Sequence, residues 1–286
     1  WRAYTQADTP AIPRTVEQLQ ARAFIAPISE VSYWPIRDFG LAEPTVDAGA
    51  AGVYDVAANR FLFAKNRDEK LPIASVTKLM SAVVVVESLP LDDIYIAAAE
   101  DLNVDGLGAD LLKNERIKGF DLLQIMLIKS SNDAAITFAH AAAKRDIDFV
   151  ARMNEKARQF GMFNSSFYDA AGLDKRSYST VSDLTILAQK ISTYPQIWQI
   201  LRMPEADVRS ADGSIIHHLI STNKLLGKIA GIIGGKTGYT EEAQGTMVLT
   251  VAINGNDDTI ISVVLGSHSR FTDTKTLIDW AQKAHK

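Results

Sequence analysis

The sequence contains no cysteine among its 286 residues. A disulfide framework, a zinc site built on cysteine and a cysteine nucleophile are therefore excluded. Long apolar runs are also absent, since none reaches the roughly 18 residues of a transmembrane helix, and the sequence shows no signal-peptide pattern. The formal net charge is only -4, without a block of one sign, which argues against a nucleic-acid partner or a polybasic membrane patch.

The composition is that of a globular protein, with 47% hydrophobic and 22% charged residues. This length allows one large core, or one core and an additional lobe. Residues 1–45 hold five of the nine prolines, so we interpret them as an N-terminal arm or stalk, with one helix near 15–24. The chain begins at Trp1 rather than Met, which is compatible with removal of an export signal or membrane anchor.

The segment Ser75-Val76-Thr77-Lys78 follows Pro72 and opens a run with helical apolar spacing. Residues three apart are neighbours on a helix, so Lys78 would lie one turn from Ser75 on the same face. A desolvated lysine near other cations can lose its proton and serve as the base that a serine nucleophile needs. Alone, this spacing is more typical of a helix cap and a solvated lysine.

Apolar periodicity and turn residues predict strands before and after a helical middle. The expected strands cover 49–54, 60–64, 215–220, 231–239, 245–253 and 259–265, and the expected helices cover 75–89, 120–128, 133–143, 146–160, 180–191 and 274–284. We expect an α/β (α+β) fold in which early and late strands share one antiparallel sheet, with the first and last helices packed on it. The sheet part would comprise about 46–90 and 196–286, and a helical lobe about 91–195. A cleft between them is the expected site.

Two further triplets occur in order after Ser75 and Lys78. Ser130-Ser131-Asn132 interrupts two apolar helices, and Lys236-Thr237-Gly238 ends a predicted strand before Tyr239. Each triplet is weak alone, but the ordered set is typical of class A β-lactamases and penicillin-binding proteins.

The chain resembles low-molecular-weight penicillin-binding proteins of the D-alanyl-D-alanine carboxypeptidase/endopeptidase family. The resemblance covers roughly 47–282 and is carried by the segments 54–70, 72–82, 122–135, 153–174, 178–187 and 223–240. It implies a β-lactamase/transpeptidase-like fold and a serine D,D-peptidase catalytic domain over 46–286. The triplet Ser-Ser-Asn followed by Asp133 favours this branch over class A β-lactamases.

The resemblance also implies roles for the site residues. Ser75 would be acylated by the substrate, with Lys78 as proton acceptor, provided that the charge of Lys236 across the cleft keeps it partly neutral. Ser130 would pass a proton to the leaving amine, and Asn132 would hold Lys78 and the substrate backbone.

Substrate binding is assigned in the same way. Lys236 and Thr237 would bind the terminal carboxylate, and Gly238 would let the substrate approach the strand edge. The backbone N–H groups of Ser75 and Tyr239 would form the oxyanion hole. Asp174, in a loop near the site, is either a substrate-site residue or a loop-capping carboxylate. Arg270 is either part of the carboxylate pocket or an ordinary surface arginine.

The resemblance leads us to expect a D-Ala-D-Ala carboxypeptidase that acts on peptidoglycan pentapeptides outside the cytoplasmic membrane. The alternative is an endopeptidase that cleaves cross-linked stem peptides. β-Lactams would be covalent inhibitors, and no cofactor or metal is implied. No convincing β-lactamase-type deacylating glutamate is found; Glu205, Glu241 and Glu242 are candidates only by residue type.

The alternative functions are a class A-like β-lactamase, a non-catalytic peptidoglycan-binding protein and a Ser-His-Asp hydrolase. The last has no Gly-x-Ser-x-Gly segment to support it. The five histidines are expected to have structural roles or to lie at the surface: His140, His217, His218, His268 and His285.

Overall fold

The structure is a computed structural model that describes residues 37–102, 111–253 and 258–284. The chain divides into two units, Trp1–Trp34 and Pro35–Lys286, and all described residues belong to the second. The helix expected near 15–24 lies outside the described residues. From the sequence we also expect a loop marked by Gly106 and Gly108 and a hairpin turn at 254–257, and both of these lie outside the described residues as well.

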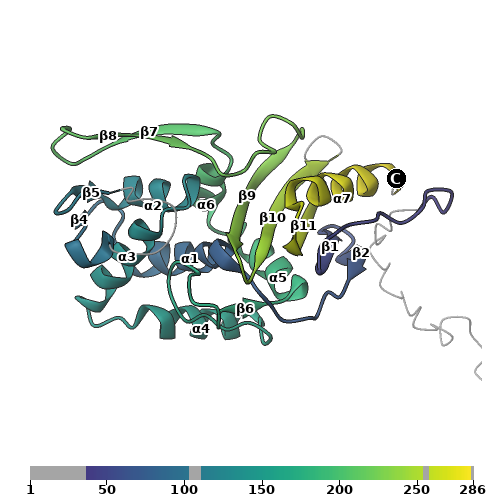
Figure 1. The fold of residues 1–286 in the computed structure, drawn as a ribbon, viewed down its shortest axis with the longest axis horizontal. Coiled ribbons are helices and arrows are strands. Elements are labelled where there is room, and N and C mark those ends of the chain that lie inside the picture. Colours follow the sequence, from purple (N-terminus) through teal and green to yellow (C-terminus); the bar gives the residue numbers. More distant parts are fainter. Residues whose placement is uncertain (1–36, 103–110, 254–257, 285–286) are drawn as a thin grey trace, which may run out of the picture. The chain divides into compact units, whose positions relative to one another are not determined.

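A five-stranded antiparallel sheet joins the two ends of the described chain, as the sequence predicts. Its order is β2-β1-β11-β10-β9, and Figure 1 shows these strands side by side. The strands are β1 (Ala50–Asp55), β2 (Arg60–Lys65), β9 (Ile232–Thr240), β10 (Gln244–Ile253) and β11 (Asp258–Ser267). β1 is buried along its whole length, because it lies between β2 and β11 and beneath helices on both faces.

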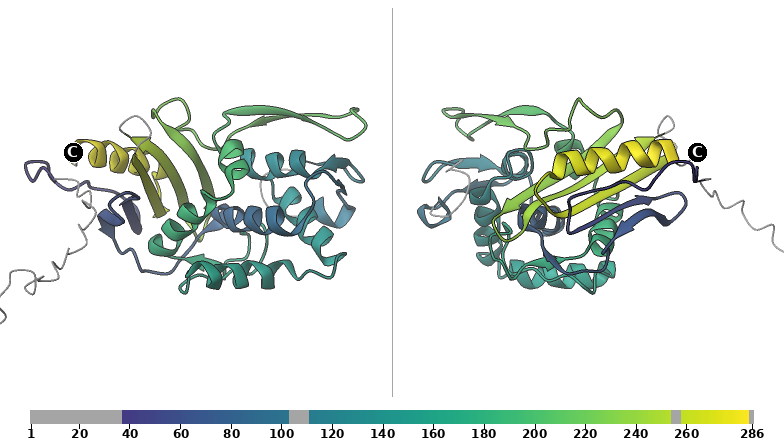
Figure 2. Two further views of the ribbon diagram at one scale, coloured as in Figure 1. Left: turned by 180° about the vertical axis from the view of Figure 1, so that it is seen from behind. Right: turned by 45° about the vertical axis from the view of Figure 1, so that its right-hand side comes forward.

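The two faces of the sheet are covered by helices from different parts of the chain (Figure 2). The last helix, α7 (Arg270–Ala284), packs on one face, as expected. The opposite face is covered by α5 (Val181–Ile191), and not by the helix that follows Ser75. That part of the prediction was wrong, because α1 (Lys78–Ser88) is buried from Lys78 to Val85. A helix that is apolar all round belongs inside a group of helices rather than on a sheet.

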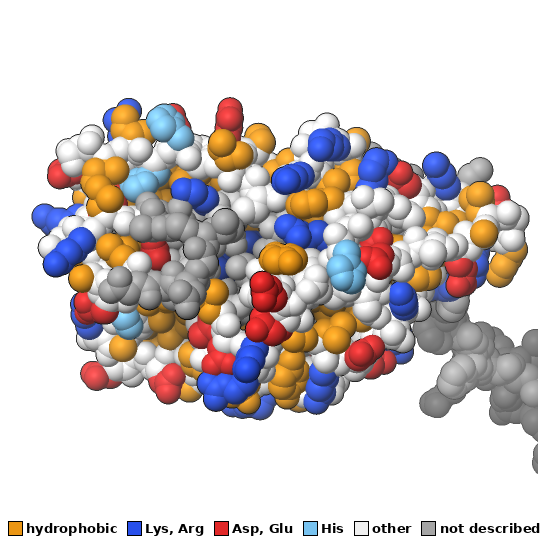
Figure 3. Space-filling model, in the orientation of Figure 1, with side chains coloured by type: hydrophobic (Ala, Val, Ile, Leu, Met, Phe, Trp, Pro, Cys, Tyr) orange, Lys and Arg blue, Asp and Glu red, His pale blue; other side chains and the backbone are white. Residues whose placement is uncertain are grey.

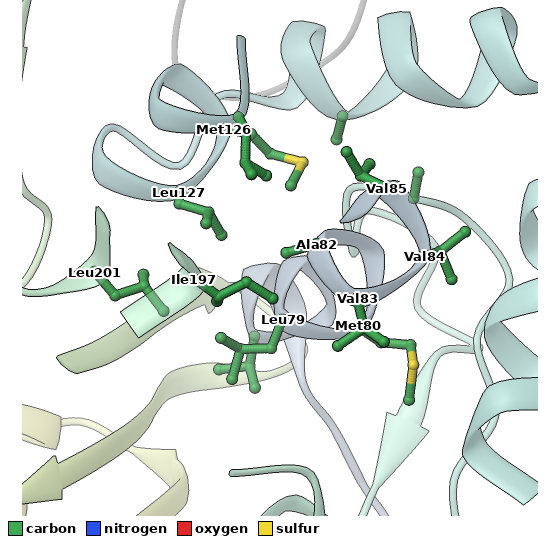
Figure 4. Close-up of a cluster of buried hydrophobic side chains, with 14 of the residues drawn as sticks. Leu79, Met80, Ala82, Val83, Val84, Val85, Met126, Leu127, Ile197 and Leu201 are labelled. Atoms are coloured by element: carbon green, nitrogen blue, oxygen red, sulfur yellow. The ribbon is translucent and has the colours of Figure 1, made fainter. Parts of the chain in front are cut away.

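The helix α1 forms the centre of the helical part. It packs against α2 (Gly119–Ile128), α3 (Asn132–Ala143) and α4 (Phe149–Phe160). Figure 4 shows Leu79 and Ala82 of α1 among Met126 and Leu127 of α2 and the short helix α6 (Pro195–Leu201). This central position fixes the start of α1, which carries the Ser75 motif.

Local signals account for several helix ends. Asp148 caps the first turn of α4, Gly161 ends that helix with φ +86°, and the hydroxyl of Thr180 caps α5 by accepting from the Asp183 N–H. Pro195 begins α6 (Pro195–Leu201), a helix that we did not predict from the sequence, although proline is favoured at that position.

Small two-stranded sheets complete the fold. The strand expected near 215–220 is β8 (Ile216–Ile220), and its partner β7 (Glu205–Arg209) escaped prediction because most of its residues are exposed and polar. The others pair β3 (Leu71–Pro72) with β6 (Tyr178–Ser179), and β4 (Ile94–Ile96) with β5 (Arg116–Lys118). The 3₁₀ turns η2 (Ala74–Thr77) and η3 (Ala99–Leu102) lie between these elements.

The segment that precedes β1 lies against α7. The Asp38 N–H donates to the Ala284 carbonyl at 2.7 Å, and the Trp280 indole donates to the Ala42 carbonyl at 2.9 Å. Residues 37–45, which we assigned to the arm, are therefore bonded to the last helix. Among the described residues, no helix combines the length and apolarity needed to cross a bilayer.

The carboxylate of Asp273 is the buried polar link between α7 and the start of β1. It accepts from the backbone N–H groups of Asp47 and Ala48 at 3.1 and 3.0 Å and from the Ser267 hydroxyl at 2.6 Å. Asp273→Ala would leave these donors without a buried acceptor. We expect a loss of roughly 2–4 kcal/mol in the free energy of unfolding, measured by urea denaturation.

The matched control is Asp279→Ala on the same helix. Asp279 is 40% exposed and pairs with Lys275, so its removal should change the free energy of unfolding by less than about 0.5 kcal/mol. Equal effects of the two substitutions would contradict the role assigned to Asp273.

Candidate active site

Ser75 lies in the 3₁₀ turn η2, three residues before the first residue of α1. Its side chain caps neither helix; its hydroxyl accepts from the Lys78 ammonium at 2.9 Å. Ala74, just before it, has a left-handed φ of +47°, which is unusual for a residue with a Cβ. Ser75 is partly exposed while both its neighbours are buried, so the turn presents this residue to the surface.

Lys78 is completely buried, at 0% exposure, among oxygen atoms from three parts of the chain. Besides Ser75, its Nζ donates to Asn132 Oδ1 at 2.7 Å and to the Ala171 carbonyl at 2.8 Å. Lys78 is therefore not the solvated lysine that the Ser-x-x-Lys spacing alone suggested.

Ser130 and Lys236 form a second buried pair. Lys236 is 1% exposed, and its Nζ donates to Ser130 Oγ at 2.7 Å and to the Thr237 carbonyl at 2.8 Å. Ser130 has a φ of +67° in the break between α2 and α3 that the sequence predicts. The adjoining Ser131 caps α3, so the break ends one helix, starts the next and turns Ser130 toward β9. Unusual backbone at such a place is typical of functional sites.

Gly238 brings the edge strand β9 against the turn that bears Ser75. A Cβ at this position would lie 2.8 Å from the Ser75 nitrogen and 2.5 Å from the Thr246 hydroxyl. The next residue, Tyr239, is 58% exposed. The structure therefore puts the backbone of Ser75 beside the end of the Lys-Thr-Gly segment.

The two lysines make the site electrostatically unusual. Burial, and after it the charges of Lys78 and Arg270, lower the pKa of Lys236 well below its ordinary value. Two ammonium groups in one polar cluster repel each other, so the form in which both are charged is disfavoured. Figure 3 shows further Lys and Arg side chains on the surface over β9, β10 and α7.

Arg270 begins α7 on the Lys236 side of the site. Its guanidinium lies 4.8 Å from the centre of the Phe271 ring and 5.9 Å from that of Tyr239, and burial lowers its pKa. Its Nε is buried with no hydrogen-bond partner within the described chain. These contacts differ from those of an ordinary surface arginine.

Asp174 faces Arg176 instead. Their side chains meet at 2.5 Å, and hydrogen bonds from Arg176 lower the pKa of Asp174 to about 2. The structure joins this carboxylate to its own loop and not to Ser75, Lys78 or Lys236.

The loop 169–174 contributes contacts that the sequence reasoning missed. Asp169 accepts from the backbone N–H groups of four residues, Ala171 to Asp174. This holds the Ala171 carbonyl at Lys78. Gly172 has a φ of +81°, and a Cβ there would lie 2.0 Å from the Ala74 carbonyl, so the loop packs directly on η2. An aspartate three residues before a glycine was the available signal, since such side chains bond to nearby backbone.

The four described histidines contact carboxylates, and none of their rings is hydrogen-bonded to Ser75, Lys78, Ser130, Asn132 or Lys236. The pairs are His140–Asp101, His217–Glu115, His218–Asp207 and His268–Asp47. His285 lies outside the described residues. No three His, Asp or Glu side chains of the described chain are grouped as metal ligands.

Residues 38–269 match the family of D-alanyl-D-alanine carboxypeptidases. The chain belongs to this family. Its members are serine hydrolases, which agrees with the resemblance carried by the three short motifs.

Known D-alanyl-D-alanine peptidases resemble the chain over most of its length. A D-alanyl-D-alanine endopeptidase of Pseudomonas aeruginosa is 33% identical over 239 residues, covering 82% of this chain and 77% of the relative. Penicillin-binding protein D2 of Listeria monocytogenes, solved with ampicillin bound, is 34% identical with a TM-score of 0.73, covering 84% of this chain and 99% of that one. A Mycobacterium tuberculosis D-alanyl-D-alanine carboxypeptidase structure is 27% identical with a TM-score of 0.76, covering 86% and 95%. The predicted antiparallel sheet with helices belongs to this shared fold.

Lys236 should lower the stability of this D-alanyl-D-alanine peptidase. Because its pKa is lowered on folding, the unfolded chain binds a proton that the folded chain does not, over a pH window that ends near the usual lysine pKa of about 10.4. The contribution of Lys236 to the free energy of unfolding therefore rises with pH across this window and falls as the pH drops. We expect Lys236→Met to be about 1–3 kcal/mol more stable than the wild type at pH 7, with a weaker pH dependence, in urea denaturation at a series of pH values.

Lys275→Met provides the control, because Lys275 is 48% exposed in a surface ion pair and its replacement should leave both stability and pH dependence nearly unchanged. A Lys236→Met protein that is less stable than wild type at neutral pH would show that the buried ammonium is not a cost to folding.

Proposed function

We propose that the chain is a serine-type D-Ala-D-Ala carboxypeptidase that acts on peptidoglycan stem peptides through an acyl-enzyme on Ser75. The observation that supports this most directly is the hydrogen-bonded group of Ser75, Lys78 and Asn132, beside which Lys236 on β9 donates to Ser130 in the break between α2 and α3. The nucleophile is partly exposed, whereas both lysines are buried.

Lys78 is proposed to take the proton of Ser75. A neutral amine has two N–H donors and one lone pair. The Asn132 Oδ1 and the Ala171 carbonyl accept hydrogen bonds and have no proton to give. With its two protons on these acceptors, the lone pair of Lys78 faces the Ser75 hydroxyl at 2.9 Å, which is hydrogen-bond reach for a general base.

Ser130 is proposed to pass a proton to the amine that leaves when the acyl-enzyme forms. Its bond to Lys236 would hold the hydroxyl beside the scissile bond. The backbone N–H groups of Ser75 and Tyr239 would stabilise the oxyanion, and one such donor is typically worth about 3 kcal/mol in the transition state. The closeness of the Ser75 nitrogen to Gly238 supports this pairing of turn and strand.

The terminal carboxylate of the substrate is proposed to lie against Lys236, Thr237 and Arg270. All three supply donors or positive charge, and the unpartnered Nε of Arg270 is suited to a carboxylate. The absence of a side chain at Gly238 would let the peptide backbone run along the edge of β9. We leave Asp174 out of the proposed site, because its carboxylate is held by Arg176.

Peptidoglycan lies outside the cytoplasmic membrane, so we propose that the protein acts there. β-Lactams should acylate Ser75, as the Listeria relative has been solved with ampicillin and with cefotaxime bound. Glu205, Glu241 and Glu242 are exposed at the start of β7 and in the β9–β10 turn. These exposed positions favour slow release of the acyl group, and so a peptidase over a β-lactamase.

The test is mass spectrometry after exposure to benzylpenicillin. We expect one covalent adduct on the wild-type protein that persists, and none on Ser75→Ala, because the serine oxygen is the only group proposed to be acylated. The control is Ser88→Ala at the end of α1, which should keep the adduct. Absence of an adduct on wild type, or rapid repeated hydrolysis of penicillin, would overturn the proposal in favour of a non-catalytic protein or a β-lactamase, respectively.

A second candidate, a D,D-endopeptidase, is favoured by the similarity to the D-alanyl-D-alanine endopeptidase of Pseudomonas aeruginosa. Both activities would use the same residues and differ in whether the leaving amine is free D-alanine or part of a second stem peptide. Purified muropeptides distinguish them. We expect D-alanine from pentapeptides, whereas monomers released from dimers, with pentapeptides left intact, would assign the endopeptidase.

A further inference from the structure

The hydroxyl of Thr237 has a partner that none of the three motifs contains. Its Oγ1 donates to Oγ1 of Thr222 at 2.7 Å. Thr222 lies two residues after the end of β8 and 15 residues before Thr237 in the sequence. In space, it lies directly against β9. Thr237 is 3% exposed and Thr222 is partly buried, so the bond lies at the wall of the proposed carboxylate pocket.

Thr222 is held from both sides. Its backbone N–H donates to the carbonyl of Ile128 at 3.2 Å, and Ile128 is the last residue of α2, two residues before Ser130. On its other side the chain makes a fixed turn, in which Asn223 accepts from the Leu225 N–H. Thr222 therefore connects the end of α2 that presents Ser130 with the strand that presents Thr237.

The chemistry of a hydroxyl gives this contact a consequence. A carboxylate only accepts hydrogen bonds, so Thr237 has to turn its single proton toward the carboxylate in order to bind it. The Thr237 oxygen then loses its present partner unless Thr222 turns as well and donates its own proton. A donor that itself receives a hydrogen bond is more polarised and binds an anion more strongly.

We propose that Thr222 is a specificity-determining residue, which orients the Thr237 hydroxyl and thereby favours substrates with a free carboxylate. This inference rests on the proposed function. Thr222 acts through Thr237 and needs no contact of its own with the substrate.

The experiment compares acids with neutral analogues. Rates of Ser75 acylation are measured by mass spectrometry with benzylpenicillin and with its methyl ester, and kcat/KM with an acyl-D-Ala-D-Ala peptide and its C-terminal amide. For Thr222→Val we expect the acid-to-neutral ratio to fall by about fivefold, the size of one hydrogen bond. Thr222→Ser, which keeps the hydroxyl, should retain the wild-type ratio.

Thr250→Val is the matched control. Thr250 is a buried threonine on β10 whose hydroxyl has no hydrogen-bond partner in the described chain, so its replacement should leave the ratio unchanged. Thermal unfolding of each variant shows that it is folded.

Two results would overturn the role of Thr222. One is an equal loss of rate with acids and neutral analogues, which would mean that Thr222 only maintains the structure. The other is an unchanged ratio in Thr222→Val. A wild-type protein that reacts with none of these compounds would instead overturn the proposed function, and this inference with it.

Discussion

Two lysines buried within one polar cluster are the constraint on which the rest of the structure depends. Lys78 and Lys236 are 0% and 1% exposed, and an ammonium group without water needs oxygen acceptors around it. Those acceptors come from segments far apart in the sequence: Ser75, Asn132 and Ala171 around Lys78, and Ser130 around Lys236. The cluster therefore exists only when the helices and the sheet are both in place.

The fold provides this by placing rigid elements on each side. The buried helix α1 fixes the turn that carries Ser75, and β9 is fixed by its pairing with β10. Segments with unusual backbone lie between these elements: Ala74, Ser130 and Gly172 all have positive φ. The loop at Gly172 packs so closely on Ala74 that a side chain there has no room. Three of the strained segments of the described chain thus lie around the proposed site.

Much of this could be predicted from the sequence, and the failures have physical causes. Apolar periodicity located α2, α3 and α4 and the strands of the sheet, because burial of one face leaves a regular pattern. The choice of α1 over α5 as the helix on the sheet was wrong because α1 is buried along most of its length, whereas α5 keeps a polar side that faces away from the core. The ordered triplets pointed to Ser75, Lys78, Ser130 and Lys236, which the structure brings together. Ala171 and Thr222 escaped notice because their contacts join a backbone carbonyl and a hydroxyl to residues elsewhere in the chain, which no spacing in the sequence records. Asp169 did leave a signal, its position three residues before Gly172, but that signal indicates only a local turn.

The different exposure of Ser75 and Lys78 has a chemical consequence of its own. A neutral amine is intrinsically a better nucleophile toward a carbonyl than an alcohol is, and an amide formed on it would not hydrolyse. A base of this kind beside an acyl donor therefore risks being acylated itself, which would inactivate the protein for good. Lys78 is completely buried, whereas Ser75 next to it is partly exposed. Burial thus allows the amine to accept protons while keeping acylating agents away from it, and the ester on serine remains the one product that water can still remove.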